Sequence, residues 1–256
     1  MARKVRPTRF PNSVAVTYSR DLKRQVREMG KVSLDVFDNQ IKEEIKALKR
    51  SDSIEIRMDG PLSLIQSAIT VITNEANRIY DVHVSTQIAT NFVKLLDKAN
   101  FKNMASQGKI KGVDPTDNSD KLSDFMEAAI QENVSYITNI KDTYMTNVER
   151  IILQGAKKSS TIKDIRQQLM EQTGMTRRRA EFIATDQAGT IFGQMTAERH
   201  QNMGVKEFIW RTSGDERVRE SHEELDGKKF SYKNPPDVGM PGEDFRCRCV
   251  AEPVFE

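Results

Sequence analysis

Apolar residues recur at intervals of three and four along most of the chain, and this spacing predicts long amphipathic helices. The first stripe runs over residues 18–50, with a gap near Ser33 and with Gly30 as a candidate bend. Its apolar members are Leu22, Val26, Met29, Phe37, Ile41, Ile45 and Leu48. A second stripe covers residues 61–100 and opens on a proline, which suits the first turn of a helix. Alternating apolar residues at 54–58 predict a short strand or extended link between the two helices.

Helical spacing continues through residues 121–203. Thr161 and Asp164 have the spacing of a capping box, which predicts the start of a helix there. We expect this helix to stop before Gly174 and a further helix to begin with Thr176 as its cap.

The pattern changes after residue 204. Residues 205–210 and 245–254 alternate like strands, and residues 228–230 predict a short strand between them. Residues 214–225 predict a short charged helix. The predicted fold class is therefore mainly α, with long helices in an elongated body and a small α+β unit at the C-terminus.

The breaks in the pattern divide the chain into five segments. Two glycines and a proline mark the central one as a linker. In order, the segments are a basic extended arm (1–18), a long-helix region (19–105), the linker (106–120), a helical region (121–203) and the small α+β unit (204–256).

Charge is unevenly distributed, although the net charge of the 256 residues is only +3. The first 50 residues hold 13 Lys and Arg against 6 Asp and Glu. A basic arm of this kind either solubilises a poorly ordered terminus or contacts nucleic-acid phosphates. The candidate phosphate contacts are Arg3, Lys4, Arg6, Arg9, Arg20, Lys23, Arg24 and Arg27.

Composition excludes several classes of protein. No window approaches the roughly 20 apolar residues of a membrane span, and the basic start lacks the apolar core of a secretory signal. Two cysteines provide no disulfide framework, and they fit a chain made in a reducing cytosol.

Both cysteines, Cys247 and Cys249, lie near the C-terminus, in the same region as His222. In a strand, residues two apart share a face, so the two thiols and the imidazole could supply three ligands to zinc. Asp226, Asp215 or water could be the fourth. One histidine with C-x-C falls short of paired C-x-x-C knuckles, and the alternative is that the thiols are small buried apolar groups. A nucleophilic triad of Cys249, His222 and Asp226 lacks any accompanying oxyanion feature.

Several short motifs in this region occur in a fixed order. An aromatic-ending strand precedes a D-x-R-V-R-x-x-H segment, L-D-G, a Pro/Gly loop and a final C-R-C. The residues are Trp210, Asp215, Arg217, Val218, Arg219, His222, Leu225, Asp226, Gly227, Pro241, Gly242, Cys247, Arg248 and Cys249. Over about residues 150–253 the chain resembles the Mu F-like minor head protein family of tailed phages, also called phage head morphogenesis proteins. Where that family often has an R-T-E-like triplet, this chain has Ala184, Thr185 and Asp186.

The resemblance implies a structural virion component with no enzymatic activity. Its expected place is the capsid interior at the portal vertex, with the portal protein, other head proteins and packaged double-stranded DNA as partners and with no membrane. The expected role is head assembly, DNA packaging or DNA ejection, with zinc as the one candidate cofactor. Two alternatives stay open: an enzyme or toxin-like module related to Mu F-like domains, and a nucleic-acid-binding protein outside the virion.

Overall fold

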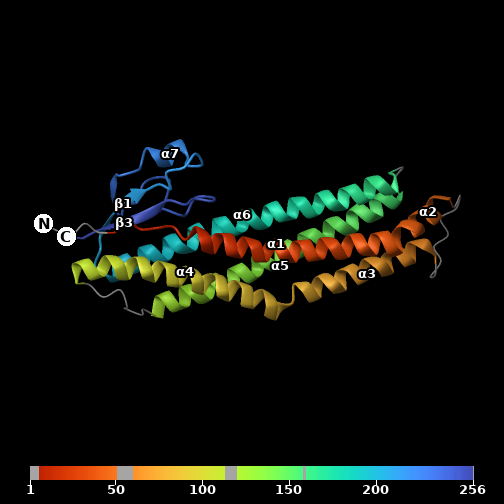
Figure 1. The fold of residues 1–256 in the computed structure, drawn as a ribbon, viewed down its shortest axis with the longest axis horizontal. Coiled ribbons are helices and arrows are strands. Elements are labelled where there is room, and N and C mark those ends of the chain that lie inside the picture. The colour runs from red at the N-terminus through yellow and green to blue at the C-terminus, as the bar shows by residue number, and fades with distance from the viewer. Residues whose placement is uncertain (1–5, 51–59, 113–119, 158–159, 256) are drawn as a thin grey trace. The chain divides into compact units, whose positions relative to one another are not determined.

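The computed structural model describes residues 6–50, 60–112, 120–157 and 160–255. Most of these residues are helical, and a small antiparallel sheet lies close to the C-terminus (Figure 1). The helices are α1 (Asn12–Val36), the π-helical turn η1 (Phe37–Ile41), α2 (Lys42–Arg50), α3 (Pro61–Ile79), α4 (Val82–Lys111), α5 (Asp120–Lys157), α6 (Ile162–Asn202) and α7 (Glu220–Glu223). The strands are β1 (Glu207–Arg211), β2 (Lys229–Ser231) and β3 (Val250–Val254). The predicted class, mainly helical with a small α+β unit, is confirmed.

Two compact units make up the fold, and neither is a continuous stretch of chain. Unit 1 contains the described residues of 1–19, 88–133 and 182–256. Unit 2 contains those of 20–87 and 134–181. Helices α1, α4, α5 and α6 contribute to both units, whereas the sheet and α7 belong to unit 1 alone.

The core of unit 2 contains the first predicted stripe. Six of its seven members are at most 1% exposed, namely Leu22, Val26, Met29, Phe37, Ile41 and Ile45. Gly30 does not end the helix, because α1 continues to Val36. A Cβ atom at Gly30 would lie 2.5 Å from Thr173 Cγ2, so the glycine instead permits close packing against α6.

Helix α1 begins at Asn12, so the prediction of an extended arm reaching residue 18 is wrong. The amide of Val14 donates to the carbonyl of Pro11 at 2.9 Å, which closes the first turn. Burial then favours the helix over an extended chain, because Tyr18 is 2% exposed and stacks on Phe92 with ring centroids 3.9 Å apart.

The second predicted helix is in fact two. The chain breaks at Asp81, whose carboxylate accepts the amide of His83 at 2.8 Å and so begins α4. Helix α4 then continues to Lys111, so the predicted linker does not start at residue 106. The predicted link at 54–58 and residues 113–119 of the linker lie outside the described residues.

Helix α6 runs without a break from Ile162 to Asn202, so the predicted stop before Gly174 is wrong. One glycine costs a helix about 1 kcal/mol relative to alanine, and the buried face of α6 outweighs this cost. Thr176 is not a cap, because its hydroxyl donates to the carbonyl of Gln172 at 2.9 Å inside the helix. The capping box is confirmed, since Thr161 N lies 2.9 Å from Asp164 Oδ2.

The sheet has the order β2-β1-β3, and both strand pairs are antiparallel. Phe208 and Trp210 point from β1 into a small core that also contains Cys247, Cys249 and Ala251. The third strand starts only at Val250, so the prediction that it includes residues 245–249 is wrong.

Candidate functional site

The segment before β3 is a loop that crosses helix α6. We call residues 241–249 the cysteine loop. A Cβ atom at Gly189 would lie 2.3 Å from the Cys247 carbonyl oxygen, and one at Gly193 would lie 2.2 Å from that of Pro241. The loop backbone therefore lies directly on the helix, at two positions where any side chain would collide with it.

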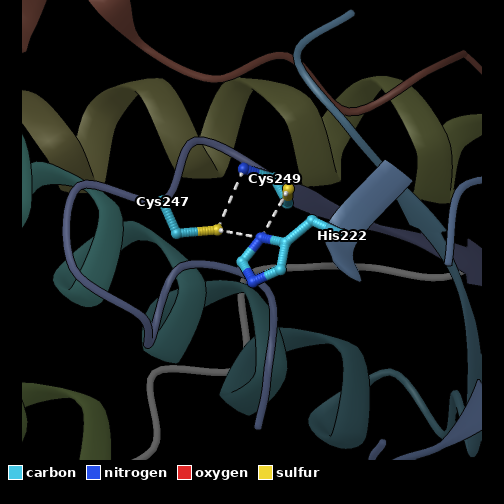
Figure 2. A group of neighbouring side chains, drawn as sticks. All are labelled: His222, Cys247 and Cys249. Atoms are coloured by element: carbon cyan, nitrogen blue, oxygen red, sulfur yellow. Dashed lines mark hydrogen bonds between the residues drawn. The ribbon is translucent and has the colours of Figure 1, made fainter. Parts of the chain in front are cut away.

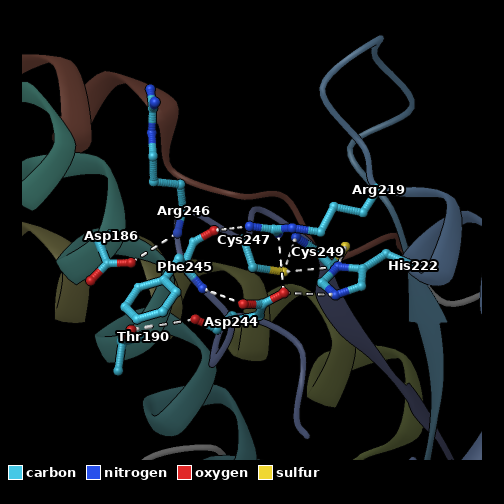
Figure 3. A network of polar contacts seen from close by, with 10 residues as sticks. Asp186, Thr190, Arg219, His222, Asp244, Phe245, Arg246, Cys247 and Cys249 are labelled. Atoms are coloured by element: carbon cyan, nitrogen blue, oxygen red, sulfur yellow. Dashed lines mark hydrogen bonds and ion pairs between the residues drawn. The ribbon is translucent and has the colours of Figure 1, made fainter. Parts of the chain in front are cut away.

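Polar contacts fix the cysteine loop from two sides (Figure 3). From α6, Asp186 Oδ1 accepts the backbone N–H of Arg246 at 2.8 Å. From the segment before α7, Arg219 Nη2 donates to the Phe245 carbonyl at 2.6 Å. Arg246 has a φ of 55°, a left-handed conformation that interrupts extended backbone and turns the chain between these two contacts.

The two thiols meet the imidazole at the end of this loop (Figure 2). His222 Nδ1 lies 3.6 Å from Cys247 Sγ and 3.6 Å from Cys249 Sγ. The backbone N–H of Cys249 also donates to Cys247 Sγ at 3.4 Å. All three residues are at most 5% exposed. The sequence prediction that these side chains come together therefore agrees with the geometry, although a loop and not a strand aligns the thiols.

The two thiols titrate as a pair. The pKa of Cys247 is lowered to about 6, first because the Cys249 thiol donates to it and then because the amides of Cys249 and Gly242 and the charge of His222 stabilise its thiolate. Burial opposes this shift. The pKa of Cys249 is raised, because this thiol holds the shared proton beside a neighbouring thiolate in a buried environment. The arrangement therefore favours one thiolate next to one thiol.

A carboxylate lies on the other side of the imidazole. His222 Nε2 is 3.3 Å from Asp244 Oδ2, and Arg219 Nη1 lies 3.3 Å from the same oxygen. The ring of Trp210 packs edge-on against His222, with centroids 5.4 Å apart. The imidazole is thus oriented from three directions, with Nδ1 facing the sulfurs.

Asp226 and Asp215, the predicted carboxylate ligands, both have other partners. Asp226 Oδ1 accepts the amide of Thr212 at 2.8 Å, and Asp215 Oδ1 accepts Arg248 Nη2 at 2.7 Å. Within the described parts of the chain, the group of close metal-ligand atoms that holds His222 contains the two cysteines and no carboxylate. The prediction of Asp226 as a ligand or as the acid of a triad is therefore wrong, because the D-G turn uses its carboxylate to hold Thr212.

The other motif residues build the frame of the site. Gly227 has a φ of 77° and donates its amide to the Trp210 carbonyl at 2.9 Å, which joins β1 to the turn before β2. Arg217 donates its amide to Asp215 Oδ1 at 3.2 Å, and its side chain is exposed. Arg248 holds this acidic turn against the cysteine loop.

The candidate DNA contacts are distributed over both units. Arg3 and Lys4 lie outside the described residues. Arg6 and Arg9 have exposed side chains, but their carbonyls accept the amides of Gln107 and Asn103, both at 3.0 Å, so this stretch is docked on unit 1. In unit 2, the remaining candidates divide into two exposed arginines and two basic residues with carboxylate partners. The exposed pair is Arg20 and Arg27, and the partnered pair is Lys23 with Glu181 and Arg24 with Asp21.

Sequence reasoning missed four residues of this site. Gly189 and Gly193 form a G-x-x-x-G pair on α6, and that spacing could have indicated a surface for close backbone contact. Asp186 was seen only as a departure from a family triplet, yet it holds the loop through Arg246. No sequence pattern indicated a contact between Asp244 and His222, because His222 lies 22 residues earlier along the chain.

These features define a small α+β domain in which a cysteine loop and one histidine close over the end of a long helix. Residues 146–252 match the model of the family described as Phage Mu protein F like protein. This match supports the resemblance to that family, which the order of the motifs predicts.

Two curated proteins are similar to the chain. An uncharacterized protein of Haemophilus influenzae (strain ATCC 51907 / DSM 11121 / KW20 / Rd) is 30% identical over 262 residues, which cover 100% of this chain and 56% of that protein. The NAD(+)--arginine ADP-ribosyltransferase EFV of Enterococcus faecalis (strain ATCC 700802 / V583) is 27% identical over 131 residues, or 45% of this chain and 27% of that protein. The chain thus spans about half the length of the first relative and about a quarter of the second. No solved structure matches it.

Among the described residues, every helix is too short or too polar to cross a lipid bilayer.

Proposed function

We propose that this protein is a minor head protein of a tailed phage, located inside the capsid at the portal vertex. The observation that carries the proposal is the family match over residues 146–252. The protein would be made in the bacterial cytoplasm and built into the head, where it would assist assembly, packaging or ejection of the DNA. The portal protein and other head proteins would be its partners.

Mass spectrometry of purified particles tests this role. Heads and tails of the phage or prophage that encodes the chain are separated on a gradient, and each fraction is digested and quantified against the portal protein. We expect peptides of this chain in the head fraction, at a low and constant ratio to the portal. Heads that contain the portal but lack this chain, and that still package DNA and infect, would overturn the proposal.

Packaged DNA is the second proposed partner. Arg6 and Arg9 are exposed although their backbone is docked, so their guanidinium groups could reach phosphates without the cost of ordering a free arm. Such contacts would be independent of sequence and sensitive to salt.

The salt dependence of binding measures this contact. In the double variant Arg6→Gln/Arg9→Gln, the slope of log K against log salt should fall by about 1.8, at roughly 0.9 per phosphate. The variant Lys94→Gln/Lys102→Gln removes the same charge from exposed positions on α4 and should leave the slope nearly unchanged. Equal slopes in both double variants would mean that the two arginines do not contact the DNA.

An enzymatic role has less support. The similarity to the ADP-ribosyltransferase covers 27% of that protein, and its name applies to the whole of it. The strongest candidate nucleophile in the described site, the Cys247 thiol, is 3% exposed, so a substrate would have to open the site to reach it. Turnover by the wild-type chain that disappears in Cys247→Ser, with the fold retained, would favour an enzyme over a head protein.

A further inference from the structure

Three donor atoms in the tail converge with the separations of a metal site. His222 Nδ1 lies 3.6 Å from each of the two sulfurs, and the three atoms lie within 4.8 Å of one another. A tetrahedral zinc ion with bonds of about 2.1 Å to nitrogen and 2.3 Å to sulfur would place the nitrogen about 3.6 Å from each sulfur. We propose that His222, Cys247 and Cys249 bind a zinc ion that fastens the cysteine loop to α7. The proposal does not depend on the role in phage heads.

Hydrogen bonding alone leaves this group poorly satisfied. A neutral imidazole nitrogen without a proton has one lone pair in the ring plane, so it can accept one thiol well and not two. Zinc binding would release the thiol protons and hold both sulfurs as thiolates beside the same nitrogen. One ion would thus satisfy three groups that are nearly out of contact with water.

The outer contacts of the histidine also match a metal ligand. Asp244 lies at Nε2, which favours the tautomer with its proton on Nε2 and a free lone pair on Nδ1. Histidines that bind zinc usually direct their second N–H toward a carboxylate or carbonyl, and Asp244 lies within ion-pair distance of Nε2, although the two atoms are not aligned as a hydrogen bond. Arg219 contacts both Asp244 and the Phe245 carbonyl, so the carboxylate is itself held in place.

Trp210 supplies a separate observation. Its indole N–H is fully buried and has no aligned acceptor among the described residues, which is costly inside a protein. The Cys249 sulfur is the group with which this N–H interacts. A zinc-bound thiolate at Cys249 would be a stronger acceptor than a thiol and would satisfy the indole.

The position of the ligands gives the ion a structural role. Within the described residues, the chain supplies three ligands to this group, so water or a small anion would complete the tetrahedron. The ligands come from α7 and from the cysteine loop, two short segments that are separated along the chain. Zinc would link them in the folded state only, and its binding energy would therefore stabilise the fold.

Metal analysis of the purified full chain tests the proposal. The chain is expressed with added zinc, dialysed and measured by mass spectrometry of the elements, and we expect about one zinc per chain. Cys247→Ser should reduce the zinc content at least tenfold. His83→Gln is the matched control, because His83 is exposed on α4 and should retain full zinc content.

Cobalt(II) provides a readout that does not require a cysteine variant to fold. Titration of the metal-free wild-type chain should produce the intense absorption of thiolate-to-cobalt charge transfer. Asp244→Asn should weaken cobalt binding by about 10- to 100-fold and leave the band itself unchanged at saturation. A chain with less than about 0.1 zinc and no thiolate band on addition of cobalt overturns the site, as does a disulfide between the two cysteines.

Discussion

Unit 2 and the cysteine loop are held together in different ways. In unit 2, long helices bury a continuous stripe of aliphatic and aromatic residues such as Leu22, Val26 and Phe37. In the cysteine loop, backbone lies directly on the α6 glycines, and side chains such as Asp186 and Arg219 satisfy its polar groups. The first region depends on apolar area and the second on exact fit and satisfied hydrogen bonds, so mutations should affect them differently.

The largest effect is expected where a large apolar side chain is removed from unit 2. Ile72 is 0% exposed on α3, and Ile72→Ala should lower the free energy of unfolding by about 2–5 kcal/mol, because it leaves a cavity. Its neighbour Val71 is 42% exposed, and Val71→Ala should change stability by less than about 0.5 kcal/mol. Urea unfolding followed by circular dichroism measures both. If the two variants lost similar amounts of unfolding free energy, the face of α3 that contains Ile72 would not be packed in the core.

The apolar stripe explains why most of unit 2 could be predicted from the sequence. Period and burial agree from Leu22 to Ile45, because every third or fourth position faces the same core. The break at Asp81 was missed, because apolar spacing continues across it and only a side-chain cap interrupts the helix. The continuity of α6 through Gly174 was missed for the opposite reason, since a weak local preference yields to packing.

The second-largest effect is expected at a glycine of α6, where this helix contacts the cysteine loop. Gly189→Ala should lower the free energy of unfolding by about 2–3 kcal/mol, because its Cβ would lie 2.3 Å from a backbone oxygen that has little room to move. We expect the loss to concentrate in the cysteine loop. Hydrogen exchange should show faster exchange of the Arg246 amide, which is bonded to Asp186.

Gly174→Ala is the matched control on the same helix. Its Cβ would meet only Arg178 Nη1, at 3.8 Å, so the substitution should stabilise the protein by about 0.5–1 kcal/mol through helix preference. A loss of stability at both glycines would mean that α6 tolerates no added methyl group at either position. Contact with the cysteine loop would then not explain the effect at Gly189.

The candidate site was only partly predictable. The sequence placed His222, Cys247 and Cys249 together because they are the scarce ligand residues of one short unit. It assigned the two cysteines to a strand and offered Asp226, Asp215 or water as the fourth ligand. The carboxylate at the imidazole is Asp244, which a turn of the cysteine loop brings to His222, and apolar periodicity does not encode such a turn.

A third prediction concerns the contact between α6 and the end of β2. His200 is fully buried beside the Tyr232 hydroxyl, its Nε2 has no partner among the described residues, and burial lowers its pKa to about 3. In the unfolded chain its pKa is near 6.5, so between pH 6.5 and 3 the unfolded state binds a proton that the folded state excludes. Stability should be complete above pH 6.5 and fall by up to about 1.4 kcal/mol per unit below it, or about 2 kcal/mol at pH 5.

The measurement is the free energy of unfolding in urea at pH 7, 6 and 5, for the wild-type chain and for His200→Gln. The variant should be less stable at pH 7 but lose less between pH 7 and 5, because it has no proton to exclude. His83→Gln should keep the wild-type slope, since His83 is exposed. Parallel slopes in the wild-type chain and His200→Gln would contradict a buried neutral histidine.

The smallest expected effect tests whether one carboxylate holds the cysteine loop on α6. Asp186→Ala removes the acceptor of the Arg246 amide and should cost about 1 kcal/mol, because the carboxylate is only half-buried and water can partly replace it. Asp186→Asn keeps an oxygen at the same position and should cost less than the alanine variant. Thermal unfolding at matched pH measures both, with hydrogen exchange at Arg246 as the local readout. The contrary outcome is that asparagine and alanine destabilise the protein equally and that the Arg246 amide still exchanges slowly in both variants. The glycine contacts and the thiol–imidazole group alone would then hold the cysteine loop. The family position occupied here by Asp186 would have no part in holding the loop on α6.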